Sequence, residues 1–299
     1  MKAARMHARG GPENLVVEDV PVPAPGPGEV RIRVAAAAIT PGELGWDLTY
    51  LHADGTPRLP SIPGHDVAGR VDAVGPDVSE LAVGDAVYAL VGFPRDGSAA
   101  EQVIVPARDV ALAPRSIPAT EAAAMPLSAL TAWQALFDHG RLAPGQRVLI
   151  LGGTGGVGSL AVQLARWCGA HVVATGGSAH RARLLALGAH EALDRAAPIA
   201  RSSEFDVVMD TVGGGAATEA LASLKPRGRA ITITAPQPGW SFFVVRPDRN
   251  QLARIAAVID AGRLRAVVQA VYPLIEAPAA FARSLARGLT GKLVLAVGS

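Results

Sequence analysis

The sequence predicts an α/β protein in which an N-terminal β-barrel precedes a doubly wound parallel sheet. In the first third of the 299-residue chain, short apolar strands are punctuated by glycine and proline, which is typical of barrels. From about Ala119, helical periodicity alternates with apolar strands, as in a parallel sheet covered by helices. A hydrophobic content of 49% is ample for two such cores.

The barrel strands are recognised by alternation. In Glu29–Val34, apolar Val30 and Ile32 alternate with Arg31 and Arg33, which predicts a strand with one solvent-exposed face. The proline-rich stretch Pro21–Gly28 is interpreted as a stiff loop, because β-type segments flank it. The other strands expected in this region are Leu15–Val20, Val67–Val74 and Asp85–Val91.

The second region alternates helices and strands. Helical periodicity predicts one helix over Thr120–Phe137. Apolar runs predict strands at Val148–Leu151, His171–Thr175, Phe205–Asp210 and Ala230–Thr234. Towards the C-terminus we expect helices near Pro247–Ala261 and Ala277–Arg287, with strands at Ala266–Val271 and Lys292–Val297.

A glycine-rich turn joins the strand Val148–Leu151 to the helix Ser159–Trp167. Its Gly153, Gly155 and Gly158 fit the G-x-G-x-x-G pattern of dinucleotide sites. They respectively permit a tight turn, backbone approach to a pyrophosphate and close helix–strand packing. The phosphates are expected at the helix N-terminus. The predicted cofactor-binding residues here are Gly153, Thr154, Gly155, Gly156, Val157 and Gly158.

The next strand favours NADP(H) over NAD(H). NAD sites usually place Asp or Glu about 20 residues after the glycines, but this chain has neither between Asp138 and Glu191. Arg and Ser suit a 2′-phosphate, which a carboxylate would repel. The expected ligands at this end are Gly176, Ser178, Arg181 and, as a weaker candidate, Arg195. Alternatively, Arg181 is a solvated helix charge.

Composition excludes several classes of protein. The net charge is only +2 and there are three lysines, without a basic stripe, so we expect no nucleic-acid partner. The single cysteine, Cys168, is interpreted as a packing residue in a reducing compartment. No apolar run is long enough to span a membrane and no signal core opens the chain. We therefore expect a soluble, cytoplasmic protein.

Several motifs together resemble the medium-chain dehydrogenase/reductase superfamily, in its zinc-free quinone oxidoreductase branch. They are Pro63–Gly69 (PGHDVAG), Leu130–Trp133 (LTAW), Gly152–Gly158, Asp210–Gly213 (DTVG), Leu224–Arg229 (LKPRGR) and Gly291–Leu295 (GKLVL). The resemblance implies a GroES-like catalytic domain (1–118), an NADP-binding Rossmann domain (119–245) and a C-terminal return (246–299) completing the first domain. It also implies an active site in the interdomain cleft and a homodimer through the Rossmann sheet edge, near Ala230–Thr234.

Zinc-dependent relatives would place their catalytic ligands near Thr40, His65 and Leu127. Of these only His65 can coordinate a metal, and no second cysteine exists. The cysteine-rich lobe that holds structural zinc is absent around Phe93–Val105. We therefore expect no metal, and interpret His65 as a residue that orients its loop by hydrogen bonding.

Zinc-free relatives reduce quinones or the C=C bond of α,β-unsaturated carbonyls, which requires hydrogen-bond donors for the developing oxyanion. The segment Ile39–Tyr50 stands in place of the family's Asn-Pro-x-Asp pattern, with Thr40 for Asn and Glu43 for Asp. Tyr50, the favoured candidate, and Thr40 are the predicted donors; alternatively, Tyr50 packs at the barrel rim. Glu43 either acts as an acid or, as we favour, holds the loop.

Aromatic residues Trp46, Phe93 and Phe243 could form an apolar slot for a flat substrate, or could belong to the core. The resemblance places Thr131 beside the nicotinamide, where the alternative is a helical Thr bonding its own backbone. It also implies that Ala235 and Phe243 hold the carboxamide through backbone groups. Lys292 either closes over the ribose or merely precedes the last strand.

The predicted function is therefore NADPH-dependent, zinc-independent reduction of a quinone or an activated C=C bond. One alternative is a biosynthetic tailoring reductase with a single polyketide-like enone or enoyl thioester as its substrate. Another is a weakly catalytic NADPH-binding redox sensor. The missing metal ligands disfavour an alcohol dehydrogenase.

Overall fold

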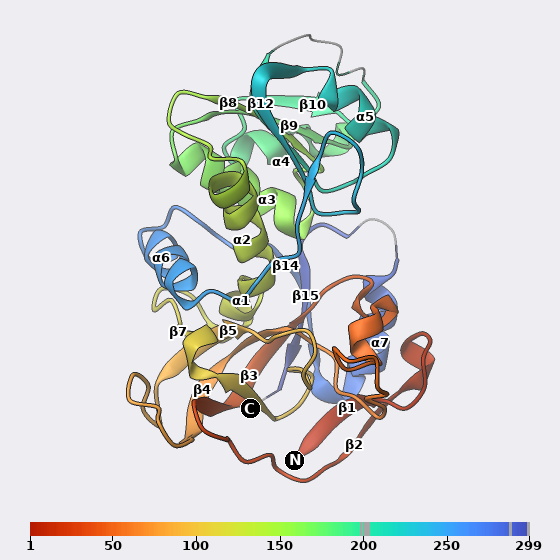
Figure 1. Cartoon of the computed structure of the whole chain (residues 1–299), viewed down its shortest axis with the longest axis vertical. Coiled ribbons are helices and arrows are strands. Elements are labelled where there is room, and N and C mark those ends of the chain that lie inside the picture. Colours follow the sequence, from red (N-terminus) through yellow and green to blue (C-terminus); the bar gives the residue numbers. More distant parts are fainter. Residues whose placement is uncertain (198, 200–203, 287–288, 298–299) are drawn as a thin grey trace. The chain divides into compact units, whose positions relative to one another are not determined.

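The computed structural model describes residues 1–197, 199, 204–286 and 289–297. The chain divides into two compact units. The barrel unit comprises Met1–Leu127, Arg246–Gly262 and Ala266–Ser299, and the Rossmann unit comprises Ser128–Val245 and Arg263–Arg265. The fold class is as predicted, a GroES-like β-domain and a doubly wound parallel sheet (Figure 1).

The barrel unit is built on a sheet that the C-terminal return extends and that is antiparallel except for the parallel pair β14–β15. Its strand order is β14-β15-β3-β4-β5-β7, with β6 also paired to β3 and a separate β1–β2 ribbon. The strands are β1 (Lys2–Met6), β2 (Leu15–Asp19), β3 (Glu29–Ile39), β4 (Asp66–Val74), β5 (Ala86–Leu90), β6 (Gln102–Pro106), β7 (Val110–Leu112), β14 (Val268–Pro273) and β15 (Lys292–Ala296). The helices are α1 (Ala119–Ala123), α6 (Arg249–Asp260) and α7 (Ala277–Ser284).

Alternation along β3 explains the barrel core. Val30, Ile32 and Val34 are buried, as their spacing predicts, and they join a cluster that includes Phe281 of α7. Strand β3 continues to Ile39, beyond the predicted Val34, because the run Ala35–Ala38 adds small side chains that pack between β4 and β15.

The C-terminal return is fixed to the barrel unit by polar contacts. The Tyr88 hydroxyl donates to the Leu252 carbonyl in α6 at 2.5 Å. Asp260 at the end of α6 accepts hydrogen bonds from the backbone N–H groups of Arg115 and Ser116. The predicted end of the last helix, Arg287, lies outside the described residues.

The Rossmann unit holds a six-stranded sheet in the order β10-β9-β8-β11-β12-β13, with every neighbouring pair parallel. Its strands are β8 (Arg147–Leu151), β9 (His171–Gly176), β10 (Glu191–Asp194), β11 (Phe205–Asp210), β12 (Leu224–Thr232) and β13 (Ser241–Phe242). Its helices are α3 (Gly156–Trp167), α4 (Arg181–Ala186) and α5 (Gly215–Leu221). The short β13 forms the outer edge and β12 lies beside it, so Ala230–Thr232 is near the edge, and dimerisation there stays a prediction.

The boundary between the units differs from the predicted one. It lies between Leu127 and Ser128 rather than between residues 118 and 119, because α1 packs on β3 and β4. The single helix expected over Thr120–Phe137 is interrupted. It is divided into α1, α2 (Pro126–Trp133) and a π-helical turn, Gln134–His139. Pro126 opens α2, since proline suits the first turn of a helix and not its interior.

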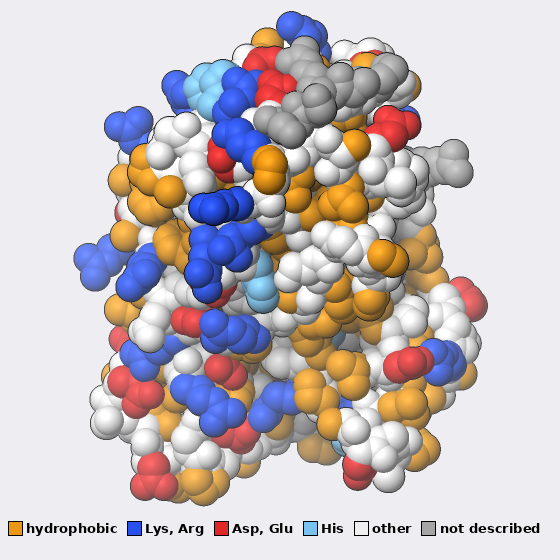
Figure 2. Space-filling model, turned by 45° about the horizontal axis from the view of Figure 1, so that its top comes forward, with side chains coloured by type: hydrophobic (Ala, Val, Ile, Leu, Met, Phe, Trp, Pro, Cys, Tyr) orange, Lys and Arg blue, Asp and Glu red, His pale blue; other side chains and the backbone are white. Residues whose placement is uncertain are grey.

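Surface features leave the partner predictions untested. Lys and Arg side chains are prominent on the face drawn in Figure 2, although the net charge of the whole chain is only +2. The absence of a nucleic-acid partner therefore stays a prediction. Across the described ranges, no helix combines the length and the apolarity needed to cross a bilayer.

Candidate active site

Three strand ends of the barrel unit bring Thr40, Asp66 and Lys292 together. Thr40 directly follows β3, Asp66 opens β4 and Lys292 opens β15. The antiparallel registers pair Ala38 with Asp66 and Ile39 with Leu293, so all three residues stand at the same end of the sheet. Hydrogen bonding between strands therefore fixes the site.

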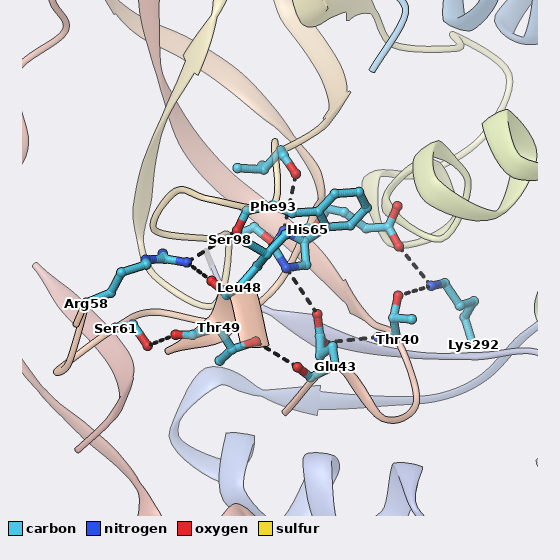
Figure 3. Close-up of polar contacts among 12 residues, drawn as sticks. Thr40, Glu43, Leu48, Thr49, Arg58, Ser61, His65, Phe93, Ser98 and Lys292 are labelled. Carbon is cyan, nitrogen blue, oxygen red and sulfur yellow. Dashed lines mark hydrogen bonds and ion pairs between the residues drawn. The ribbon is translucent and has the colours of Figure 1, made fainter. Parts of the chain in front are cut away.

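A buried ammonium lies at the centre of this group. Lys292 is 5% exposed, and its Nζ lies 3.0 Å from Thr40 Oγ1 and 2.8 Å from Asp66 Oδ2 (Figure 3). Asp66 is fully buried, and its Oδ1 accepts the Leu127 N–H at 2.6 Å, at the start of α2. Burial raises the pKa of Asp66, and the Lys292 ammonium opposes that rise. These contacts engage the ammonium within the barrel unit, and a contact of Lys292 with the cofactor ribose stays a prediction.

Glu43 holds the loop that carries Thr40. Its Oε1 accepts the Thr40 N–H at 3.1 Å, and its backbone carbonyl accepts the Thr49 hydroxyl at 2.7 Å. Gly42, at φ +83°, makes the turn between Thr40 and Glu43. This geometry agrees with the loop-holding role favoured from the sequence.

Burial leaves Glu43 and His65 uncharged at neutral pH. It raises the pKa of Glu43 to about 8 and lowers the pKa of His65 to about 4. The His65 Nδ1 lies 3.2 Å from the Val91 carbonyl, and its Nε2 faces Glu43 Oε2 at 3.9 Å. The first of these contacts fits the predicted role of His65 in orienting its loop.

Aromatic rings border the same loop. Trp46 stacks on His65 with ring centroids 5.7 Å apart, and Phe93 meets both rings edge-on. Trp46 and Phe93 are half-buried, so part of each ring remains accessible. Phe243 belongs to the Rossmann unit, where it stacks on His139 at 4.4 Å.

The structure contradicts the predicted role of Tyr50 as a hydrogen-bond donor to substrate. The ring is 2% exposed and belongs to the barrel core. Its hydroxyl donates to backbone carbonyls, with the oxygens of Leu44 and Gly10 both in reach. Tyr50 therefore joins the loop to the N-terminal segment, and Thr40 is the remaining candidate of the predicted pair.

The glycine turn between β8 and α3 leaves open space beside Gly155. Gly158 is required by the fold, because a Cβ there would lie 2.1 Å from the Gly152 carbonyl oxygen. At Gly155 a Cβ would meet only that oxygen, at 3.6 Å, so the open space lies in front of the helix. The left-handed turn itself is at Gly152, φ +81°, rather than at the predicted Gly153. A Cβ on Gly153 would instead strike Leu184.

Candidate ligands for an adenosine phosphate gather where β9 and β10 end. The Arg195 N–H donates to the Gly176 carbonyl at 2.8 Å, and the exposed Ser178 follows β9. Arg181 donates through Nη1 to the Ala192 carbonyl at 2.7 Å, so part of its guanidinium is engaged with the fold. Asp194, which no sequence motif indicated, pairs in register with Gly176.

Asp210 organises the loops at the other strand ends. This fully buried carboxylate accepts the N–H groups of Val212 and Gly213 and the Thr232 hydroxyl. It thereby fixes the chain that leads to the exposed Ala235. In the sequence, only the motif DTVG indicated Asp210.

Thr131, the residue predicted to lie beside the nicotinamide, is buried in α2.

The residues at the family's zinc-ligand positions do not fit a zinc ion. Thr40 accepts a hydrogen bond from an ammonium, Leu127 contributes only its backbone N–H to Asp66, and His65 is a single imidazole. A fixed positive charge beside these positions repels a second cation. Among the described residues, no three His, Cys, Asp or Glu side chains are grouped to hold a metal.

Comparison with known proteins places the chain in a family. Residues 26–115 match an alcohol dehydrogenase GroES-like domain, and residues 187–295 match a zinc-binding dehydrogenase domain. The mitochondrial NAD(P)H oxidoreductase RTN4IP1 of Danio rerio is 31% identical, over 80% of this chain and 73% of that protein.

Two further similar proteins have names that state an activity. The 2-methylene-furan-3-one reductase of Solanum lycopersicum is 37% identical, over 79% of this chain and 63% of that protein. The structure of the quinone oxidoreductase from Coxiella burnetii superposes with a TM-score of 0.89 at 27% identity, covering 100% of this chain and 99% of that one. The chain is thus an oxidoreductase that belongs to the medium-chain dehydrogenase/reductase superfamily, in its quinone oxidoreductase-like branch.

Proposed function

We propose that the protein uses NADPH to reduce a quinone or the C=C bond of an α,β-unsaturated carbonyl, without zinc. The observation that carries this proposal is the Thr40 hydroxyl, which accepts a hydrogen bond from the buried Lys292 ammonium. A relative named as a reductase of a methylene-furanone and a similar structure named as a quinone oxidoreductase support the same substrate class.

The chemistry of such substrates explains the need for a donor. When bound, a reduced nicotinamide would supply the hydride. The carbonyl oxygen of the substrate then carries negative charge until a proton from water completes the reduction. Thr40 meets that oxygen, because its Oγ1 already accepts from Lys292 and its own O–H is left to donate. The half-buried Trp46 and Phe93 bind the flat conjugated part of the substrate.

The Rossmann unit would hold the dinucleotide. Gly155 and the first turn of α3 would bind the pyrophosphate through backbone N–H groups. Ser178, Arg181 and Arg195 would bind the 2′-phosphate, which is the reason for proposing NADPH over NADH. Ala235 and Phe243 would hold the carboxamide through their backbone groups, and Thr131 would lie beside the nicotinamide.

Thr40→Val tests the donor. Valine keeps the shape of threonine but removes the hydroxyl, so we expect about a 100-fold loss in kcat for enone reduction, the loss typical of one oxyanion donor. Thr40→Ser keeps a hydroxyl and should retain most of the activity. The measurement is steady-state NADPH oxidation with both variants. Equal kcat values for Thr40→Val and the unaltered enzyme would remove Thr40 from the mechanism.

Arg181→Ala tests the preference for NADPH. We expect NADPH binding to weaken by about 1.5–3 kcal/mol, the contribution of one charged hydrogen bond, with NADH binding nearly unchanged. Titration calorimetry with both cofactors measures the two affinities, and Arg183→Ala serves as a control two positions along the chain. Because Arg181 also donates to Ala192, the melting temperature is recorded for each variant. Equal losses for NADPH and NADH contradict the assignment of the 2′-phosphate site.

The proposed activity itself is tested with a panel of quinones, enones, enoyl thioesters and aldehydes. Loss of NADPH absorbance with a quinone or a general enone supports the proposal. Turnover restricted to one enoyl thioester or polyketide-like enone instead favours a biosynthetic tailoring reductase. Tight NADPH binding without turnover across the panel favours the redox sensor and overturns the proposal.

A further inference from the structure

Lys292 differs from the other lysines of the chain by its burial. The chain contains only three lysines. Lys2 and Lys225 are partly exposed and pair with Asp19 and Asp206 at the surface. Lys292 is 5% exposed and pairs with a fully buried Asp66.

A buried ion pair of this kind requires an explanation other than stability. Removing an ammonium and a carboxylate from water costs several kcal/mol for each ion, and apolar residues of similar volume are often as stable. Here the pair is held from several sides. Strands β15 and β4 position the two residues, and the Leu127 N–H occupies Asp66 Oδ1.

The direction of the contacts indicates what the ammonium does. It donates to Thr40 Oγ1, and Thr40 is the half-buried member of the group, whereas Lys292 and Asp66 are buried behind it. A cation that donates to a hydroxyl oxygen makes that hydroxyl a stronger donor in turn. The chain of contacts therefore runs from Asp66 through Lys292 and Thr40 towards solvent.

We propose that the Lys292 ammonium, fixed by Asp66, has the electrostatic role of a Lewis acid. It polarises the Thr40 hydroxyl, which then donates a stronger hydrogen bond to an anionic oxygen of the ligand. The inference deepens the proposed reductase function and rests on it. Lys292 is in this account a positioning residue, which acts on the oxyanion through Thr40. No proton needs to leave the ammonium, because the hydrogen bonds alone stabilise the charge.

A double-mutant cycle over Thr40 and Lys292 tests this dependence. The variants are Thr40→Val, Lys292→Met and the double variant, with single-turnover enone reduction under saturating NADPH as the readout. We expect about a 100-fold loss for Thr40→Val and a loss of at least 10-fold for Lys292→Met. The double variant should lose no more than Thr40→Val alone, because Lys292 acts through the hydroxyl. Losses that multiply, or full activity in Lys292→Met, overturn the inference.

Two further variants separate charge from structure. Lys292→Arg retains a cation and should recover part of the rate that Lys292→Met loses. Because Lys292→Met leaves Asp66 without its counter-ion, Asp66→Asn/Lys292→Met provides a neutral pair if the single variant unfolds. It should show the same loss of rate, and a normal rate in this folded variant contradicts the inference. Lys2→Met, which removes a surface lysine of the same unit, is the matched control and should leave the rate unchanged.

A binding measurement separates failure of this inference from failure of the proposed function. The probe is 4-nitrophenolate, whose anionic oxygen imitates the developing oxyanion, with nitrobenzene as the neutral comparison. We expect Thr40→Val and Lys292→Met each to weaken phenolate binding about 10-fold or more, without additivity, and to leave nitrobenzene binding unchanged. If the unaltered protein reduces nothing on the panel yet shows this pattern, only the reductase function is wrong. If the protein reduces enones but Lys292→Met leaves its affinity for phenolate unchanged, the inference is wrong and the proposed reductase function is unaffected.

Discussion

Replacing Gly155 with valine is expected to abolish binding of both NADPH and NADH while leaving the fold intact. The backbone at Gly155, φ −73° and ψ 175°, is extended and open to any residue. A Cβ there would meet no atom closer than the Gly152 oxygen at 3.6 Å. The fold therefore does not need this glycine, whereas a pyrophosphate at the start of α3 does.

The size of the effect follows from what the valine side chain displaces. Each hydrogen bond from a backbone N–H to a charged phosphate is worth about 1.5–3 kcal/mol, and several would be lost together. Titration calorimetry with both cofactors measures the loss, and circular dichroism melting checks the fold. Gly158→Val is the contrasting variant, because its Cβ would lie 2.1 Å from the Gly152 oxygen and should unfold the unit. Unchanged affinity in a folded Gly155→Val protein would mean that the dinucleotide binds elsewhere.

Glu43→Gln should remove a pH dependence of stability. Burial raises the pKa of Glu43 to about 8 in the folded protein, against 4.5 for an exposed carboxyl. Between these values the folded state keeps a proton that the unfolded state releases, so the stability contributed by Glu43 falls as the pH rises. The fall begins near pH 4.5 and is complete above pH 8, and it amounts to about 5 kcal/mol.

Urea unfolding at pH 5 and pH 8.5 measures this prediction. Glutamine has the same shape and its carbonyl can still accept the Thr40 N–H, but it does not titrate. Glu43→Gln should therefore gain stability relative to the unaltered protein as the pH rises. Glu13→Gln, at an exposed carboxyl of the same unit, controls for the loss of a charge. Parallel pH profiles for Glu43→Gln and the unaltered protein would show that Glu43 ionises normally in the fold.

Local patterns predicted most of the fold, because hydrophobic periodicity and the residues that end helices and strands are local properties of the sequence. The alternation of Val30, Ile32 and Val34 predicted the buried face of β3, and the bounds of β11 match the predicted Phe205–Asp210. The division of residues 120–137 was not predictable from periodicity, because apolar residues continue across the break. The boundary between the two units was also not predicted, because it depends on the packing of α1 against β3 and β4.

The candidate site was predicted only where a motif named it. The family position of Thr40 indicated a candidate donor, but its partner Lys292 lies 252 positions away and meets it through strand register. Tyr50 was misjudged because a sequence does not show that the Leu44 and Gly10 carbonyls engage its hydroxyl. Asp66 stood inside the quoted motif PGHDVAG, yet its role depends on burial beside Lys292.

The central claim is that a hydroxyl backed by a fixed ammonium does the work that a metal does in zinc-dependent relatives. The measurement that tests it most directly is NADPH-dependent enone reduction by the unaltered enzyme after exhaustive chelation, and again after adding zinc. The account predicts the same kcat in all three states, because Thr40 and Lys292 come from the chain itself. Activity that disappears on chelation and returns with zinc would contradict it.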